Sequence, residues 1–395
     1  YCQGPVNLGR LEAIPELVER ADLKFPAFRP RIPERLRQSE NIFSTIAEGD
    51  ILLHHPYESF APFVEMLHQA ASDPQVVSIR QTLYRTGAES GVANALLKAA
   101  HAGKDVLVVI ELRARFDEAA NIELANALQA AGAQVVYGVV GHKTHAKMCM
   151  IIRREGRRLV RYVHLGTGNY HERTARAYTD YGLLSSDQDL GQDVQKIFQQ
   201  IAALGKAGKL RAILQSPFTL YSGVLELIEI QRQKALQGEP ALIQAKMNAL
   251  TEPSVIRALY SASQAGVHID LIIRGICCLR PGVKGVSENI RVRSIIGRFL
   301  EHMRVYCFGV DDEREVYLSS ADWMDRNLFR RVEACFPVRD VVLAKRVYRE
   351  AITNYLNDNT QAWELTSDGS YRKFKGRGKP HTAQGALMME LTEHA

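Results

Sequence analysis

The chain has 395 residues, of which 46% are hydrophobic and 24% are charged, and its formal net charge is +6 at pH 7. This length predicts two to three domains with conventional apolar cores, and the small positive excess favours anionic partners without indicating nucleic acid. No apolar run approaches the roughly 18 residues of a membrane-spanning helix, and no stretch resembles a signal peptide. The six cysteines show no zinc-type spacing, so we expect reduced core thiols in a cytosolic protein.

Residues 1–45 are rich in proline and arginine, which predicts an extended connector with one short helix near residues 11–19. Because the chain starts at Tyr1, we expect this connector to continue from a longer upstream region. Helix and strand patterns then alternate and predict an α/β domain with a mixed sheet over residues 46–212. Its predicted elements are helices at 60–71, 92–101, 118–131 and 194–207, and strands at 76–83, 106–112, 134–138, 148–153 and 160–165.

A second α/β domain is predicted over residues 213–395, after the break at Ser216-Pro217-Phe218. It repeats the first, because a helix at 253–264 precedes a strand at 269–274 just as the helix at 92–101 precedes the strand at 106–112. A basic tail follows Thr366, which predicts either a solvated segment or one that guides a polyanion. Its basic residues are Arg372, Lys373, Lys375, Arg377 and Lys379.

Two histidine motifs mark the same duplication. His145-Ala-Lys147 precedes the segments 166–169 and 173–180, and His302-Met-Arg304 precedes the segments 319–322 and 326–333. A histidine two residues before a cation on an extended strand places both side chains on the same side of the backbone. The imidazole can attack phosphorus or protonate a leaving oxygen, while the cation holds phosphate oxygens. Two copies therefore predict one active site shared by two halves.

With these motifs the chain resembles the bacterial type-1 polyphosphate kinases from about residue 4 to 373. The resemblance also rests on the segments 174–181, 273–282, 298–302 and 320–327. This family is similar in fold to the phospholipase D superfamily, which implies two tandem phospholipase D-like α/β domains related by internal duplication, and the chain would be the catalytic C-terminal half. Ile152 stands where that superfamily has an Asp, and Arg304 replaces its second motif Lys, which argues against a phosphodiesterase.

The resemblance implies reversible transfer of the terminal phosphate of ATP to inorganic polyphosphate, with Mg²⁺ and through a phosphohistidine. It implies His145 as the nucleophile, a role that neutral imidazole suits near pH 7, and His302 as the general acid or a contact to the nucleotide phosphates. The remaining implied ATP and phosphate contacts are Tyr178, Arg274, Lys147, Arg304 and Asn169, the last as an oxygen donor or a loop-fixing residue.

Arg85 and Arg115 each follow a strand of the first domain, at the sheet edge where α/β proteins gather ligands. The resemblance places the metal and the nucleotide phosphates beside them. A guanidinium cannot ligate Mg²⁺, so we interpret both as bidentate contacts to phosphate oxygens near the ion, with surface arginines as the alternative. His142, His164 and His171 crowd the first motif, and we interpret them as supporting or exposed residues.

Two other functions stay open at this point. A phospholipase D-like phosphodiesterase would use the same covalent histidine but release its product to water, and a polyanion-binding fragment would lack activity without the family's N-terminal domains. We expect ATP, ADP and polyphosphate as partners and no nucleic acid. We also expect a homo-oligomer in the full-length protein and a cytoplasmic location, with peripheral attachment to the inner membrane left open.

Overall fold

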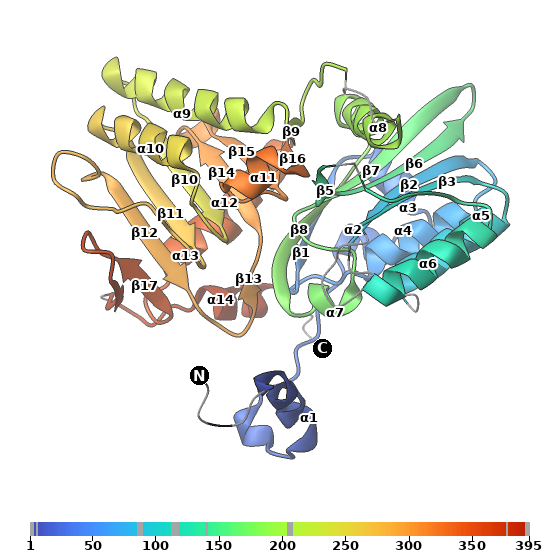
Figure 1. Cartoon of the computed structure of the whole chain (residues 1–395), viewed down its shortest axis with the longest axis horizontal. Helices are drawn as coiled ribbons and strands as arrows, with labels where there is room; N and C mark the ends of the chain where they lie inside the picture. Colours follow the sequence, from blue (N-terminus) through green and yellow to red (C-terminus); the bar gives the residue numbers. More distant parts are fainter. Residues whose placement is uncertain are drawn as a thin grey trace.

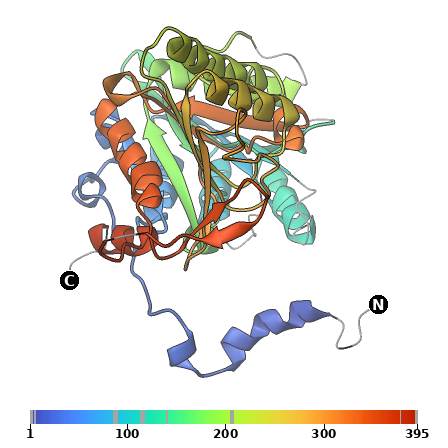
Figure 2. The ribbon, with the colours of Figure 1, turned by 90° about the vertical axis from the view of Figure 1, so that its left-hand side faces the viewer.

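The computed structural model describes residues 4, 7–84, 90–111, 118–138, 141–203, 208–376 and 378–391. Two α/β halves lie side by side, and the short helix α1 (Ile14–Leu17) stands apart from both on an N-terminal arm (Figures 1 and 2). The arm joins the first half where the main chain of Arg31 forms hydrogen bonds with the main chains of Tyr57 and Ser59. Its other turns are η1 (Leu8–Ala13), η2 (Ala21–Leu23) and α2 (Glu34–Arg37).

The first half has a mixed sheet, as the alternating pattern predicts. Strands β2, β3 and β4 are parallel, because α5 and α6 connect them as crossovers, and β6, β7, β8 and β1 continue the sheet in antiparallel order. In sheet order the strands are β1 (Ile51–His55), β8 (Tyr178–Ser185), β7 (Arg158–Gly166), β6 (Lys147–Glu155), β2 (Val76–Leu83), β3 (Asp105–Ile110) and β4 (Gln134–Val136).

Helices cover both faces of this sheet. The outer face packs against α3 (Ile42–Ala47), α4 (Ala61–Ser72), α5 (Gly91–His101) and α6 (Glu118–Ala130), whereas α8 (Gln188–Ala203) lies on the inner face; α7 (Glu172–Ala175) precedes β8 (Figure 1). The sequence of α5 shows why such a helix forms. Ser90 caps its N-terminus by accepting the amide of Ala93 at 3.1 Å, and its small apolar residues fall on one buried face.

The second half repeats this plan. Its parallel strands are β10 (Leu242–Met247), β11 (His268–Ile273) and β12 (Ile290–Ile295), flanked by antiparallel β14 (Arg304–Phe308), β15 (Glu315–Ser319), β16 (Arg331–Pro337), β9 (Leu214–Ser216), β17 (Ala362–Leu365) and β18 (Tyr371–Lys373). Helices α9 (Leu220–Leu236) and α10 (Pro253–Gln264) cover the outer face. The remaining turns and helices are η3 (Asp311–Glu313), α11 (Asp325–Phe329), α12 (Val341–Tyr348), the π-helical η4 (Arg349–Thr353), α13 (Asn354–Leu356) and α14 (Ala383–Glu390).

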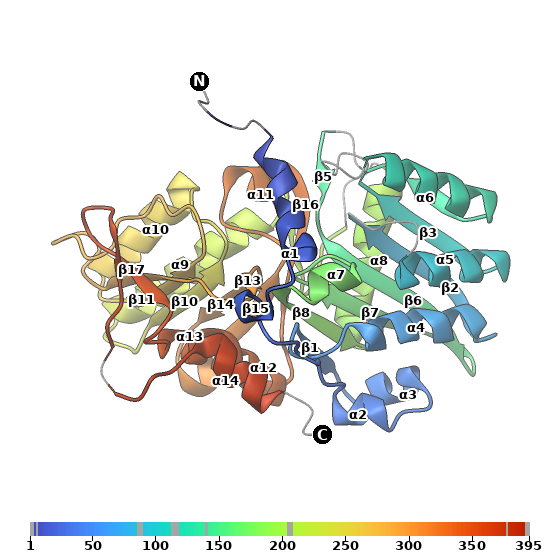
Figure 3. The ribbon, with the colours of Figure 1, turned by 90° about the horizontal axis from the view of Figure 1, so that it is seen from below.

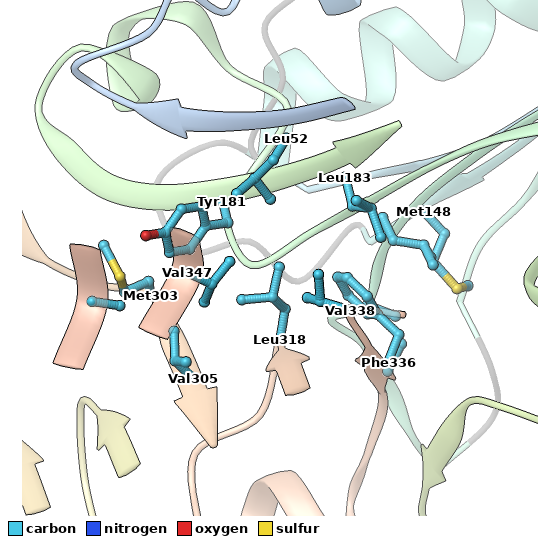
Figure 4. Close-up of a cluster of buried hydrophobic side chains, with 14 of the residues drawn as sticks. Leu52, Met148, Tyr181, Leu183, Met303, Val305, Leu318, Phe336, Val338 and Val347 are labelled. Atoms are coloured by element: carbon cyan, nitrogen blue, oxygen red, sulfur yellow. The ribbon is translucent and has the colours of Figure 1, made fainter. Parts of the chain in front are cut away.

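The inner faces of the two sheets share one hydrophobic core. In Figure 4, Leu52 and Leu183 of the first half face Leu318, Val338 and Val347 of the second. Helices α8, α12 and α14 contribute to the same cluster, and Figure 3 shows α12, α13 and α14 beside the junction of the halves. Because burial of this continuous apolar surface favours one relative placement of the sheets, the edges that carry the histidine motifs are held together.

Several local predictions differ from the structure. Helix α3 crosses the predicted connector boundary at residue 45 and buries Ile42, Phe43 and Ile46 against the first sheet. The segment after Thr366, predicted as a solvated tail or as a guide for a polyanion, contains β18, which pairs with β17, and α14, which buries Ala383 and Leu387. It is therefore not a solvated tail throughout. The hydrophobic residues of α14 account for its packing. The prediction was based instead on the basic residues that precede this helix in the sequence.

The five cysteines that the structure describes are free, and the prediction of core thiols holds for only part of them. Cys149, Cys307 and Cys335 lie on buried strands, but Cys277 is half-buried and Cys278 is exposed. Among the described helices, none is long and apolar enough to span a bilayer.

Candidate active site

Each half gives a two-residue strand to the sheet of the other half. Strand β5 (Lys143–Thr144) pairs in parallel with β16 of the second half, and β13 (Leu300–Glu301) pairs in parallel with β8 of the first (Figure 1). The histidine motifs follow these strands directly. The exchange therefore carries His145 to the second half and His302 to the first.

His145 is fixed by residues of the second half. Its main-chain N–H donates to the carbonyl of Val332 at 2.9 Å, and its Nδ1 lies 2.9 Å from Oε2 of Glu333. Glu333 also accepts hydrogen bonds from the Ser320 hydroxyl and the Asn327 amide. Since a carboxylate can only accept, Nδ1 of His145 carries the proton and its Nε2 lone pair is available to a ligand.

His302 shows the same arrangement in the opposite direction. Its Nδ1 lies 2.8 Å from Oδ2 of Asp180 on the first half, and Asp180 accepts a second hydrogen bond from the Thr167 hydroxyl at 2.6 Å. The pair Thr167 and Asp180 therefore corresponds to the pair Ser320 and Glu333. Ser320 lies 153 residues after Thr167, and Glu333 lies 153 residues after Asp180. The same offset separates the repeated segments 166–169 and 319–322.

The electrostatic surroundings distinguish the two imidazoles. Burial lowers the pKa of His145 well below its usual value, and the positive charges of Lys147 and Arg331 lower it further. Burial also lowers the pKa of His302, but the Asp180 carboxylate opposes this shift. His145 is therefore neutral at pH 7, as a nucleophile must be, whereas His302 is better placed to take up a proton.

The motif cations are buried beside the histidines. Lys147 Nζ donates to the carbonyl of His145, and burial lowers its pKa to about 7 although Glu333 opposes the shift. Arg304 donates from Nη2 to Oδ2 of Asp322 at 3.0 Å and from Nη1 to the carbonyl of His302 at 2.7 Å. Both cations are thus held in place before any phosphate binds.

Both histidines open onto one pocket of about 410 Å³ at the junction of the halves. The Tyr178 ring packs beside His302 with centroids 5.2 Å apart, and the Tyr84 ring packs beside His145 at 5.6 Å. Of the residues predicted from sequence, the pocket brings together His145, Asn169, Tyr178, Arg274, His302 and Arg304. Four arginines and two carboxamides line it, and this polar, cationic surface suits a polyanionic ligand.

Sequence reasoning missed several residues of this site. Asp180 and Glu333 end the two repeated segments at 173–180 and 326–333, so the repeat contained the signal that each orients a histidine. Other missed residues that line the pocket are Tyr84, Asn248, Arg326 and Arg331. Arg331 lies 153 residues after Tyr178 and could have been found by the same spacing.

Among the described residues predicted from sequence, His142, Lys147, His164 and His171 do not line the pocket. Arg85 and Arg115 lie outside the described residues. His164 is a core residue, with its ring 4.5 Å from the Phe63 ring and its pKa lowered by burial to about 3. His171 caps α7 by accepting the Thr174 amide at 3.3 Å, and His142 lies immediately before β5.

The fold and the site define a protein with two tandem α/β domains related by duplication, whose paired histidine motifs face one phosphate-suited pocket. The chain belongs to the polyphosphate kinase family. The family model for polyphosphate kinase C-terminal domain 1 matches residues 41–207, and the model for polyphosphate kinase C-terminal domain 2 matches residues 213–384.

Relatives and solved structures agree with this family. A polyphosphate kinase of Xylella fastidiosa is 58% identical over 390 residues, which cover 98% of this chain and 55% of the relative. The crystal structure of polyphosphate kinase from Porphyromonas gingivalis is similar with a TM-score of 0.88 and 34% identity, over 95% of this chain and 58% of that chain. The phosphatidylserine synthase of Haemophilus influenzae shares the fold, with a TM-score of 0.53 and 13% identity over 87% of this chain and 93% of that chain. The chain thus spans about half the length of the curated relatives it matches.

Proposed function

We propose that this chain is the catalytic part of an ATP:polyphosphate phosphotransferase, which reversibly transfers the terminal phosphate of ATP to polyphosphate through a phosphohistidine on His145. Membership in the polyphosphate kinase family supports this function. The observation that carries it is the hydrogen bond of 2.9 Å between His145 Nδ1 and Glu333, which leaves Nε2 as a lone-pair nucleophile facing the pocket.

The transfer then takes two displacement steps. In the first, the lone pair of His145 Nε2 forms a bond to the terminal phosphorus as the bond from phosphorus to the bridging oxygen breaks, and ADP leaves with that electron pair. In the second, a terminal oxygen of polyphosphate attacks the same phosphorus and the nitrogen–phosphorus bond breaks. The Glu333 carboxylate stabilises the positive charge that the imidazole ring acquires in the intermediate.

His302 serves the leaving and attacking oxygens. Its hydrogen bond to Asp180 fixes the ring and raises its proton affinity against the effect of burial. We assign His302 as the general acid or as a charged contact to the nucleotide phosphates. Arg274 and Tyr178, which line the pocket, are the proposed nucleotide contacts, and Asn169 and Arg304, which also line it, bind or orient phosphate. Lys147, which is buried beside His145, is the third proposed phosphate contact. Arg85 and Arg115 remain proposed phosphate contacts from the sequence.

Mg²⁺ is the proposed cofactor. The side-chain oxygens of Asn169 and Asn248 are buried and lack a hydrogen-bond donor in the described part of the chain, and both residues line the pocket. Among the same described residues, no three His, Cys, Asp or Glu side chains cluster in a way that could hold a metal ion. Mg²⁺ commonly binds through substrate phosphates and keeps several waters, so these amides fit an ion that arrives with the nucleotide. When bound, Mg²⁺ would neutralise charge on the transferred phosphate.

ATP, ADP and polyphosphate are the proposed partners, and we propose a cytoplasmic homo-oligomer for the full-length protein. The test is incubation of the full-length protein with ATP and Mg²⁺, followed by measurement of long, acid-insoluble phosphate. Polymer formation is the expected result. Phosphate or product released only to water would instead indicate a phospholipase D-like hydrolase, and binding of polyphosphate without any labelled histidine would indicate a polyanion-binding protein.

A further inference from the structure

The segment that carries His302 is braced by buried side chains from three other elements. We propose that Glu301, held by Lys246, Thr179 and Gln384, is a positioning residue that sets the His302 imidazole in the active site. This inference rests on the proposed function, because it assigns how that function's second histidine is oriented.

Glu301 is the centre of the brace. It lies on β13, immediately before His302, and only 5% of it is exposed. Its Oε2 lies 2.6 Å from Nζ of Lys246 and accepts the Thr179 hydroxyl at 2.9 Å, and its Oε1 accepts a hydrogen bond from the Gln384 amide. One buried carboxylate thus joins β10, β8 and α14.

Thr179 connects this carboxylate to the histidine. Its hydroxyl donates to Glu301 and lies 3.2 Å from the main-chain N–H of His302, which it can accept. The next residue is Asp180, which binds the His302 ring. The main chain and the ring of His302 are therefore fixed by two consecutive residues of β8.

Gln384 fixes the other end of the segment. Its Oε1 accepts the main-chain N–H of Phe299 at 2.9 Å, and its Nε2 donates to the Phe299 carbonyl at 2.9 Å. A single side chain thus pairs with Phe299 as a neighbouring strand would. Since Gln384 lies on α14, the C-terminal helix takes part in holding the active-site segment.

Lys246 neutralises the buried charge of Glu301. It is 1% exposed, its Nζ lies 3.1 Å from the centroid of the Tyr355 ring, and burial lowers its pKa to about 8 although Glu301 opposes the shift. A buried ion pair stabilises a fold weakly compared with apolar packing, but it penalises other arrangements strongly, because either charge alone would be unpaired. This property fits a positioning role.

The first half lacks a matching carboxylate at this position. The spacing of 157 residues between the histidine motifs makes Thr144 the counterpart of Glu301. Thr144 instead donates its main-chain N–H to Glu111 at 3.0 Å. The contacts of Glu301 therefore occur only beside the His302 motif. This is expected if they position His302, and not if they are a feature that both halves need to fold.

The test compares Thr179→Val, which keeps the side-chain shape but removes the hydroxyl, with Thr179→Ser, which keeps the hydroxyl. In the full-length protein, Thr179→Val and Gln384→Met should lower kcat for polyphosphate synthesis roughly 10- to 100-fold, since small misplacements of a catalytic group have such effects. The KM for ATP should stay within about twofold, and Thr179→Ser should restore kcat. Gln231→Met is the matched control, because this buried glutamine of α9 also binds main chain, at Leu242, but lies away from the pocket.

A second readout does not depend on activity. The ring ¹⁵N resonances of His302, assigned by comparison with His302→Ala, should shift in Thr179→Val and in Gln384→Met, while those of His145 stay in place. Equal kcat for Thr179→Val and Thr179→Ser, or unchanged His302 resonances in the folded variants, would overturn the proposal. If Gln384→Met does not fold, the Thr179 pair still decides. Failure of the proposed function would look different, because the wild-type protein would then make no polyphosphate at all.

Discussion

Glu333 on the second half accepts a hydrogen bond from Nδ1 of His145 on the first half, at 2.9 Å. The reciprocal contact joins Asp180 on the first half to His302 on the second, at 2.8 Å. Each imidazole therefore receives its orienting carboxylate from the other half, and neither half alone holds a complete histidine site. The continuous core that the two halves share holds them in the placement that this exchange requires.

His145→Ala should abolish labelling of the protein by the terminal phosphate of ATP and should abolish polymer synthesis, because the covalent route loses its nucleophile. The label in the wild-type protein should be acid-labile and alkali-stable. The measurement is phosphopeptide mapping after brief exposure to ATP. His171→Asn is the control, because Asn can also cap α7. Persistent label of this type in His145→Ala would move the nucleophile, with His302 the next candidate.

Glu333→Gln should keep the fold but slow phosphorylation of His145 by roughly 10²–10⁴-fold, as expected when an imidazole loses the carboxylate that selects its tautomer. A rapid-quench measurement of histidine labelling gives this rate. The comparison variant is Asp180→Asn, which removes the carboxylate that orients His302. It should slow the overall synthesis of polyphosphate more than it changes the occurrence of the phosphate label on His145. A labelling rate in Glu333→Gln within about twofold of wild type would show that this hydrogen bond does not orient the nucleophile.

Binding of polyphosphate should weaken as the pH rises from 6 to 9, partly through Lys147. Burial lowers the pKa of this lysine to about 7, so it is cationic at pH 6 and neutral at pH 9. Loss of one charged contact corresponds to about a tenfold fall in affinity. Calorimetry with tripolyphosphate at constant ionic strength measures the affinity at each pH. This fall in affinity should occur in the wild type and in the control Lys345→Met, which removes an exposed lysine. A pH dependence that is unchanged in Lys147→Met would contradict the assignment.

Glu350→Gln should lower the free energy of unfolding at pH 7 by about 3 kcal/mol, because it breaks a buried ionic network between the halves. Glu350 lies 2.8 Å from His54 Nδ1 on β1 and 2.8 Å from Arg346 on α12. Burial would raise its pKa, but the His54 hydrogen bond and the Arg346 charge lower it to about 2.

A carboxyl group with a lowered folded-state pKa stabilises the protein above its unfolded pKa, and this stabilisation is lost as the pH falls through the folded value. The difference between wild type and Glu350→Gln should therefore shrink between about pH 4.5 and pH 2. Denaturant titrations over this range measure the difference. Glu364→Gln, which changes a more exposed ion pair with Arg293, should cost less than about 1 kcal/mol. Equal losses in the free energy of unfolding for the two substitutions would show that the buried network between the halves stabilises the protein no more than an exposed ion pair does.

The chain alone should bind polyphosphate but should show little ATP-driven synthesis. The pocket provides phosphate contacts, and binding should weaken steeply with salt as counterions of the polyanion are released. The matched relatives are longer, since this chain covers 55% of one of them, and the family's adenine contacts are expected upstream. Assays of residues 1–395 beside the full-length protein at equal Mg²⁺ test this. Equal specific activity would show that the catalytic unit is self-sufficient.

The alternation of helical and strand periods was sufficient to predict an α/β fold in two halves, because these periods record which face of each element is buried. Strand β2 and helix α6 begin at the residues that the pattern indicates. The repeated motifs also identified both histidines, since a local pattern of imidazole and cation survives in the sequence without reference to the fold.

What the sequence could not decide depends on contacts between distant residues. Strands β5 and β13 have two residues each and therefore carry no periodic signal. The partner of His145 lies 188 residues away, and the partner of His302 lies 122 residues away. Such pairs form only when the inner faces of the two sheets bury their apolar side chains together, and that packing sets which half supplies each carboxylate. The sequence thus determined which histidines and cations form the site, and the tertiary structure decided that each histidine is oriented by a carboxylate of the other half.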